Sequence, residues 1–168
     1  KVPSYEGGKF PLSTYLADRV RRILADPAAW GALPAQVREW LEIQRSRSLL
    51  PRAGDLLVET FPRAGRYYLV CYPFEGRLAH QTLGMLLTRR LERARQKPHG
   101  FVANEYALAI WGAGDIALQI ERGDLSLDTL FEQDMLGDDL DAWLAESALM
   151  KRTFRSCAII SGLIERRY

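Results

Sequence analysis

The fold is decided by residues 77–96, RLAHQTLGMLLTRRLERARQ. On a helical wheel the polar side chains of this stretch form one narrow stripe: Arg77, Gln81, Thr88, Glu92 and Arg95. The apolar side chains point the other way: Ala79, Leu83, Leu86, Leu87, Leu91 and Ala94. Because such a narrow stripe is typical of a helix that is buried on most sides, we expect Arg77 to Gln96 to form the central helix of the domain.

Strand-like runs lie on both sides of this helix in the sequence. Before it, Leu56 to Phe61 and Tyr67 to Tyr72 flank the connector Pro62 to Arg66, which has hairpin length and contains glycine. After it, Phe101 to Trp111 has an extended pattern with a break at Asn104-Glu105. This order predicts an α+β fold, in which an antiparallel sheet of roughly four or five strands packs against the long central helix.

Helical segments are expected at both ends of the chain. Ser13 precedes an apolar stripe at helical spacing, and Pro34 suits the first position of a second helix. Short helices are predicted around Asp124 to Phe131 and Gly137 to Glu146. From Ser147 onward the helical period returns, with an apolar face made of Met150, Phe154, Cys157, Ser161 and Ile164.

Composition limits the class of protein. With 168 residues, 48% hydrophobic and 26% charged, the chain is long and apolar enough for one domain with a core, which excludes a disordered chain. No uninterrupted apolar run approaches the length of a membrane span, and the N-terminus has no secretory pattern. Since the chain starts at Lys1 without methionine and stops at Tyr168 inside a helical pattern, we expect it to be a fragment of a larger protein.

The two cysteines indicate a reducing compartment. Cys71 and Cys157 lie far apart in the sequence, in apolar surroundings and without a neighbouring cluster of cysteine or histidine. Such residues are typical of two unpaired thiols in a protein core. The sequence therefore predicts a cytoplasmic location and no disulfide.

A formal net charge of +2 hides an uneven distribution. Residues 78–97 and 151–167 are basic, whereas residues 115–146 are rich in carboxylates. A solvated surface explains most such runs, but arginine clusters are also what binding to a phosphate backbone requires. Both interpretations remain open for each arginine, and those near the end of the long helix also interact favourably with its C-terminus.

No constellation of residues predicts catalysis. Nucleophilic catalysis needs a base beside the nucleophile, and neither His80 nor His99 lies in a recognisable motif. The carboxylate-rich stretch lacks an EF-hand loop, and Gly7-Gly8-Lys9-Phe10 lacks the spacing and the hydroxyl of a phosphate-binding loop. We therefore expect no catalytic residue, no metal site and no cofactor in this chain, with His80 in a structural role.

Binding of nucleic acid is the remaining chemistry that the residues support. Bases stack on aromatic rings, and the candidates are Tyr5, Trp30, Trp40, Trp111 and Trp143, although tryptophans at helical or strand spacing usually belong to a core. Tyr5 differs because it lies in a polar arm flanked by glycine. The predicted nucleic-acid-binding residues are Tyr5, Lys9, Arg19, Arg22, Arg89, Arg90, Arg93, Lys151, Arg152 and Arg155.

Several strings resemble a known family. Residues 2–13, VPSYEGGKFPLS, resemble the segment that leaves the winged-helix region of Lhr-type (large helicase-related) DNA helicases. Residues 72–80, YPFEGRLAH, and residues 134–140, DMLGDDL, resemble the DEAD/H-associated region that follows. The end of the chain, including LMKRTFRSCA at residues 149–158, is similar to the ligase-associated bacterial branch of these enzymes.

The resemblance implies a bacterial, cytoplasmic superfamily 2 helicase that hydrolyses ATP with Mg²⁺ and moves 3′ to 5′ along single-stranded DNA, or a DNA–RNA tracking strand, in DNA repair. Residues 1–12 would be the arm that leaves the winged helix, and residues 13–168 would be the accessory domain. Its partners would be the motor and winged-helix domains and a DNA ligase, with no membrane. Family members often carry tryptophan where this chain has Tyr5, which implies that Tyr5 stacks on a base.

A second interpretation is a protein-interaction module. The order of strand pairs and a long helix is similar to that of secretion-chaperone folds, which bind segments of partner proteins. Such a module would dock the helicase core or the associated ligase. The two interpretations differ in their response to salt, because phosphate binding weakens steeply with salt and apolar docking does not.

Overall fold

The computed structural model describes residues 12–133, 137–138, 141 and 148–164, which form two compact units. The first unit ends at Ser126 and contains the four strands, and the second begins at Leu127. Within the described helices, none is long and apolar enough to cross a membrane.

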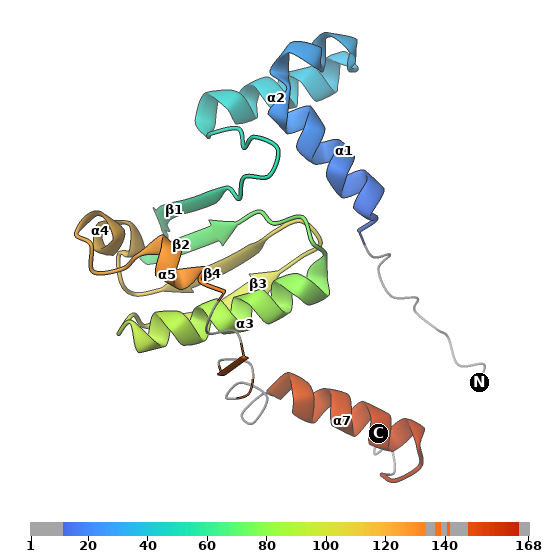
Figure 1. Ribbon diagram of the computed structural model, residues 1–168, viewed down its shortest axis with the longest axis vertical. Coiled ribbons are helices and arrows are strands. Elements are labelled where there is room, and N and C mark those ends of the chain that lie inside the picture. Colours follow the sequence, from blue (N-terminus) through green and yellow to red (C-terminus); the bar gives the residue numbers. More distant parts are fainter. Residues whose placement is uncertain (1–11, 134–136, 139–140, 142–147, 165–168) are drawn as a thin grey trace. The chain divides into compact units, whose positions relative to one another are not determined.

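The first unit is built on a four-stranded antiparallel sheet (Figure 1). Its strands are β1 (Val58–Arg63), β2 (Arg66–Cys71), β3 (Pro98–Ala103) and β4 (Leu108–Gly112). They lie in the order β1-β2-β4-β3, so the two hairpins of the sequence are joined through β2 and β4. This arrangement confirms the predicted α+β fold.

The first hairpin turns more tightly than the sequence predicts. Its connector is the two residues Ala64 and Gly65, at φ values of 50° and 71°, so the strands extend through Pro62 and Arg63 on one side and Arg66 on the other. Positive φ at both central residues is the turn that best matches the twist of two paired strands. Pro62 is tolerated inside β1 because this strand lies at the edge of the sheet.

Helix α3 (Arg77–Arg93) lies along one face of the sheet and packs on β3 and β4 (Figure 1). Its buried face includes His80, Gly84, Leu87 and Leu91, which recur at helical spacing. Every residue from His80 to Leu91 is buried or half-buried, in line with the expectation of a largely buried helix, but the first turn is not, and Leu78 there is 77% exposed.

The core between α3 and the sheet is made by side chains in cross-strand register. Leu69, Ile110 and Phe101 lie opposite one another on β2, β4 and β3, and the first two are fully buried. Phe101 packs against Gly84, where a Cβ atom would lie only 2.5 Å from Cδ2 of the ring. The glycine therefore allows the helix to approach the sheet closely.

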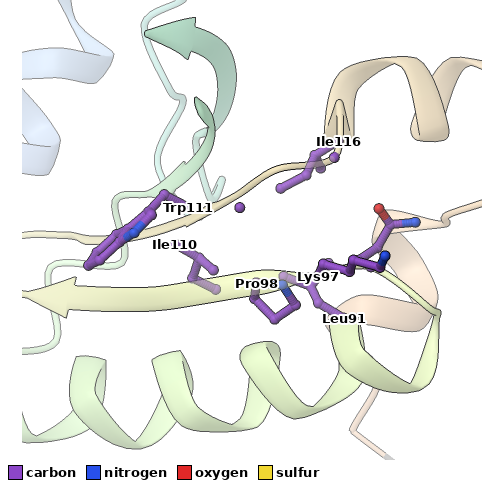
Figure 2. Close-up of a pocket in the computed structure, with 9 residues that line it drawn as sticks. Leu91, Lys97, Pro98, Ile110, Trp111 and Ile116 are labelled. Carbon is purple, nitrogen blue, oxygen red and sulfur yellow. The ribbon is translucent and has the colours of Figure 1, made fainter. Parts of the chain in front are cut away.

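The sheet is followed by a short helix, α4 (Ile116–Glu121), which the sequence analysis did not predict. The Asp115 side chain caps it by accepting a hydrogen bond of 3.1 Å from the backbone N–H of Leu118. Ile116 is buried and lines a small cavity with Leu91 and Ile110 (Figure 2). Helix α4 thus closes the core at the C-terminal end of α3.

A helical hairpin (residues 14–47) precedes the sheet, as the sequence predicts. It consists of α1 (Thr14–Ala25), a 3-10 helix η1 (Pro27–Ala32) and α2 (Ala35–Arg47). Trp30 is 3% exposed, and its indole N–H donates to the carbonyl of Ile23 at 2.6 Å, which folds η1 back on α1. Ser13 occupies the N-cap position of α1, but its side chain makes no capping hydrogen bond.

The end of the helical hairpin reaches the sheet through Glu59. Its carboxylate accepts hydrogen bonds from the hydroxyls of Ser48, directly after α2, and of Tyr72, the latter at 2.8 Å. Burial, together with the bond to Glu59, raises the pKa of Tyr72 to about 12. The phenol therefore stays protonated and remains the donor at neutral pH.

The second unit contains α5 (Leu127–Leu130) and α7 (Ala148–Ile160), which confirm two of the three helices predicted there. The third, Gly137 to Glu146, lies mostly outside the described residues. Both cysteines are unpaired, as predicted, but only Cys71 is a core thiol, and burial raises its pKa to about 12. Cys157 is exposed on α7, so the expectation that it is buried is wrong.

Candidate nucleic-acid interface

The string YPFEGRLAH forms the junction between the helical hairpin and the sheet. The Arg21 guanidinium on α1 donates to the backbone carbonyl of Pro73 and pairs with the Glu75 carboxylate at 2.6 Å. It also lies 5.9 Å from the centre of the Phe74 ring, a distance typical of a cation–π contact. This part of the family-like motif is therefore occupied by contacts that hold the fold together.

The same junction contains a carboxylate at the start of α3. Glu105, in the turn between β3 and β4, accepts a hydrogen bond of 3.1 Å from the backbone N–H of Arg77 and one from Leu12. The Arg77 side chain approaches the other carboxylate oxygen at 3.2 Å. The backbone hydrogen bond from Arg77 is the largest cause of a pKa of Glu105 below its ordinary value.

We expect Glu105→Gln to destabilise the chain at neutral pH. A lowered pKa in the folded state means that the ionised carboxylate adds stability above its unfolded pKa, and that this stability is lost as the pH falls through the folded value. The difference between wild type and variant in urea unfolding should therefore shrink on acidification. Glu42→Gln, which removes an exposed carboxylate from α2, is the control; an equal loss from it would contradict the prediction.

His80 is fully buried and both of its ring nitrogens are occupied. Nε2 accepts a hydrogen bond of 3.0 Å from the backbone N–H of Glu75, and Nδ1 lies 2.7 Å from the carbonyl of Asn104, to which it donates. These two bonds require the neutral ring with its proton on Nδ1. The predicted structural role of His80 is confirmed.

Within the described ranges, the structure contains no group of three or more histidine, cysteine, aspartate or glutamate side chains that could hold a metal ion. Glu75, whose backbone N–H donates to His80, and Glu105, which follows Asn104, are both engaged in the contacts described above.

The structure brings Arg19 and Arg22 together with Tyr15 on one face of α1. All three side chains are exposed, Tyr15 by 87%, and they line a groove of about 530 Å³ between α1 and η1. The floor of the groove includes Trp30, whose hydrogen bond to α1 fixes η1 in place. The spacing of Tyr15, Arg19 and Arg22, four and three residues apart, is what places them on one face.

The arginines of α3 lie on a separate surface. Arg21 attaches the helical hairpin beside the start of α3, whereas Arg90 is about 20 Å further along the helix axis from Arg77. Arg90 and Arg93 belong to the last turn of α3, where cations interact favourably with the helix C-terminus, and Arg89 pairs with Glu92 at 3.7 Å. The predicted α1 and α3 clusters therefore do not form one continuous track.

The other predicted residues lie in different parts of the chain. Tyr5 and Lys9 are outside the described residues. Lys151, Arg152 and Arg155 lie on α7 in the second unit, and Arg155 is exposed. Their roles remain predictions.

The candidate stacking residues differ in exposure. Trp30 is buried, so the idea that it stacks on a base is wrong. Trp40 is 68% exposed on α2, Trp111 is half-buried on β4, and Trp143 lies outside the described residues. Tyr15 is not among the predicted binding residues, although its helical spacing from Arg19 and Arg22 is a signal that could identify it.

Comparison with known proteins gives the family. Residues 50–168, which are well over half of the chain, match the model of the family described as DEAD/H associated. No curated protein and no solved structure matches the chain. The matched residues include all four strands, the loop that Arg21 holds, and α3. The chain therefore belongs to the DEAD/H associated family and is an accessory domain of a helicase of the DEAD/H type.

Proposed function

We propose that this domain belongs to an Lhr-type helicase of the ligase-associated bacterial branch and contributes to the path of its DNA. The parent enzyme would use ATP and Mg²⁺, bound by its motor domains, to move 3′ to 5′ along single-stranded DNA during repair in the cytoplasm. Family membership supports the helicase context, and the strings at both ends of the chain support the finer assignment. The domain itself would perform no chemical step.

The observation that carries the DNA part is the exposed face of α1. Tyr15 offers a ring on which a base can stack, and Arg19 and Arg22 offer two cations on the same face of the helix. Stacking and phosphate contacts together are the usual means of binding single strands without sequence preference. Tyr5 and Lys9, in the arm ahead of α1, are proposed to extend the same path, with Tyr5 stacking on a further base.

The test is fluorescence anisotropy of labelled single-stranded and duplex DNA at increasing salt. We expect binding that favours the single strand and weakens with salt. Arg19→Gln/Arg22→Gln should make the dependence of log affinity on log salt concentration less steep by about 1.4, because two phosphate contacts are lost. Tyr15→Ala should weaken binding by about ten-fold without a large change in this slope.

The matched control is Arg38→Gln/Arg52→Gln, which removes two exposed arginines from elsewhere in the first unit. It lowers the net charge equally and should leave the slope almost unchanged. Equal effects from the two pairs would contradict a site on α1 and indicate general attraction of DNA to positive charge. Absence of salt-sensitive binding at low salt would refute the proposed DNA contact altogether.

A second candidate function, docking of the helicase core or of a DNA ligase, is favoured by a different observation. A groove of about 310 Å³ between the helical hairpin and the sheet has a mainly apolar lining that includes Leu41, Leu49 and Leu57. Leu49 is 78% exposed there and Trp40 is 68% exposed. Binding of the motor domains that resists salt and is lost in Leu49→Asp would support this function.

A further inference from the structure

One face of the sheet packs on α3, and the opposite face carries a row of aromatic rings. In the register of the strands, Phe61 lies opposite Tyr68, and Tyr68 lies opposite Trp111. Side chains alternate between the two faces along each strand. Because Leu69 and Ile110 belong to the buried face against α3, the three aromatic residues share the other face.

The rings lie on three neighbouring strands and reach over a fourth. Phe61 and Tyr68 are stacked, with ring centres 5.5 Å apart and planes inclined by 12°. Trp111 lies opposite Gly100 on β3, where a Cβ atom would be 3.0 Å from Cζ2 of the indole. The Trp111 ring therefore extends over the β3 backbone, in the space that the missing side chain of Gly100 leaves.

This surface lies away from the known contacts of the helical hairpin. Those contacts reach Glu59, near the start of β1, and Pro73, just beyond the end of β2. The aromatic row lies nearer the opposite end of the two strands, toward the Ala64–Gly65 turn. Phe61 is 38% exposed, and Val102, on the same face of β3, is 59% exposed.

The charges beside the rings are positive. Arg63 and Arg66 are paired in register, are exposed, and point to the same face as Phe61 and Tyr68 because they lie two residues away from them on their strands. Within the four described strands, Glu59 is the only carboxylate on this face, and Ser48 and Tyr72 bind it. The face thus combines stackable rings with two cations, and the carboxylate of Glu59 is held by two hydroxyls at the end of β1 away from the arginines.

We propose that this aromatic face (Phe61, Tyr68 and Trp111 with Arg63 and Arg66) binds single-stranded DNA, with bases stacked on the rings and phosphates held by the two arginines. The inference rests on the proposed function, because it names a second surface at which the domain contacts single-stranded DNA. A sheet with helices on one face and aromatic rings on the other is an established way to bind unpaired nucleotides. The aligned arginines complement a phosphate backbone, and this favours DNA over an apolar segment of protein.

The test compares labelled single-stranded DNA with an abasic strand of the same length, using the 168-residue chain. Phe61→Ala and Trp111→Ala should each weaken binding to the normal strand by about ten-fold and leave binding to the abasic strand nearly unchanged. Arg63→Gln/Arg66→Gln should weaken binding to both strands and reduce the salt dependence by about 1.4 in slope. Tyr106→Ala, at an exposed ring in the turn between β3 and β4, is the control for loss of an aromatic side chain outside this face.

A cross-linking experiment on the wild type tests the same face without any substitution, so it does not depend on whether the variants fold. DNA carrying 5-iododeoxyuridine should cross-link, under ultraviolet light, to Phe61, Tyr68 or Trp111, identified by mass spectrometry. Wild-type binding with no such cross-link, and with the sheet variants unaffected, would overturn this inference and leave the proposed function standing. Absence of salt-sensitive binding by the wild type would overturn both. Loss of motor-domain binding by the same variants, with DNA affinity intact, would assign the face to protein and overturn the inference.

Discussion

Replacing Gly84 by valine should destabilise the chain by about 3 kcal/mol, the upper end of the usual cost of overpacking a close contact. A Cβ atom at this position would meet three atoms of the Phe101 ring, the nearest at 2.5 Å. The neighbour is a half-buried ring of β3 that packs against α3, so the helix must move away from the sheet, or the ring must turn aside, to relieve the clash. Urea unfolding followed by circular dichroism measures the loss.

Alanine at the same position separates two opposing effects. Alanine favours a helix over glycine by about 1 kcal/mol, so a gain in stability would result if there were room. We expect a net loss of about 1 kcal/mol or more instead, because the Cβ clash outweighs this preference. Gly31→Ala, where nothing lies within 4 Å, is the control, and a Phe101→Leu background should reduce the cost at Gly84. Stability equal to or above wild type in Gly84→Ala would contradict the close approach.

His80→Leu should cost roughly 2–5 kcal/mol, because it leaves the N–H of Glu75 and the carbonyl of Asn104 without their partner. Leucine fills a similar volume, so the loss reports on the two hydrogen bonds more than on a cavity. The free energy of unfolding from urea titration is the measurement. ¹⁵N chemical shifts of the wild-type ring should also show the neutral form protonated on Nδ1.

His99→Leu is the matched control for this change. His99 is exposed on β3, so the same substitution should alter stability by less than about 0.5 kcal/mol. Equal losses in the two variants would mean that the buried ring at position 80 is not held as described. Because His80 joins the loop at Glu75 to the turn at Asn104, its loss should also weaken the attachment of α1 through Arg21.

Local patterns in the sequence predict the elements well but their ends less well. The runs around Leu69 and Ile110 are identified as strands because apolar and β-branched residues are concentrated there. The connector between β1 and β2 was expected to be five residues, since Pro62 is unusual inside a strand. Pro62 is accommodated because β1 lies at an edge, and the sequence pattern does not reveal which strand is at the edge.

Of the candidate DNA-binding residues, the sequence predicts only the grouping of those that lie on one helix. Arg19 and Arg22 share a face because of helical spacing alone, which the sequence contains. The row Phe61–Tyr68–Trp111 needs the pairing of β2 with β4, and the residues involved are more than forty positions apart. Periodicity assigns each ring to a face of its own strand but does not say which strands are neighbours. The alignment of Phe61, Tyr68 and Trp111 on one face of the sheet therefore had no signal in the sequence.

The proline in β1 also bears on how the domain behaves at high concentration. In a hairpin with a two-residue turn, the pair that closes the turn, here Arg63 and Arg66, is hydrogen-bonded across the two strands. The next pair, Pro62 and Tyr67, is not, so the backbone nitrogen of each residue points away from the other strand of the hairpin. Pro62 has no N–H, and the outer side of β1 therefore lacks a donor that an incoming strand from another molecule would need. This edge is thereby protected against strand addition and the aggregation that follows from it.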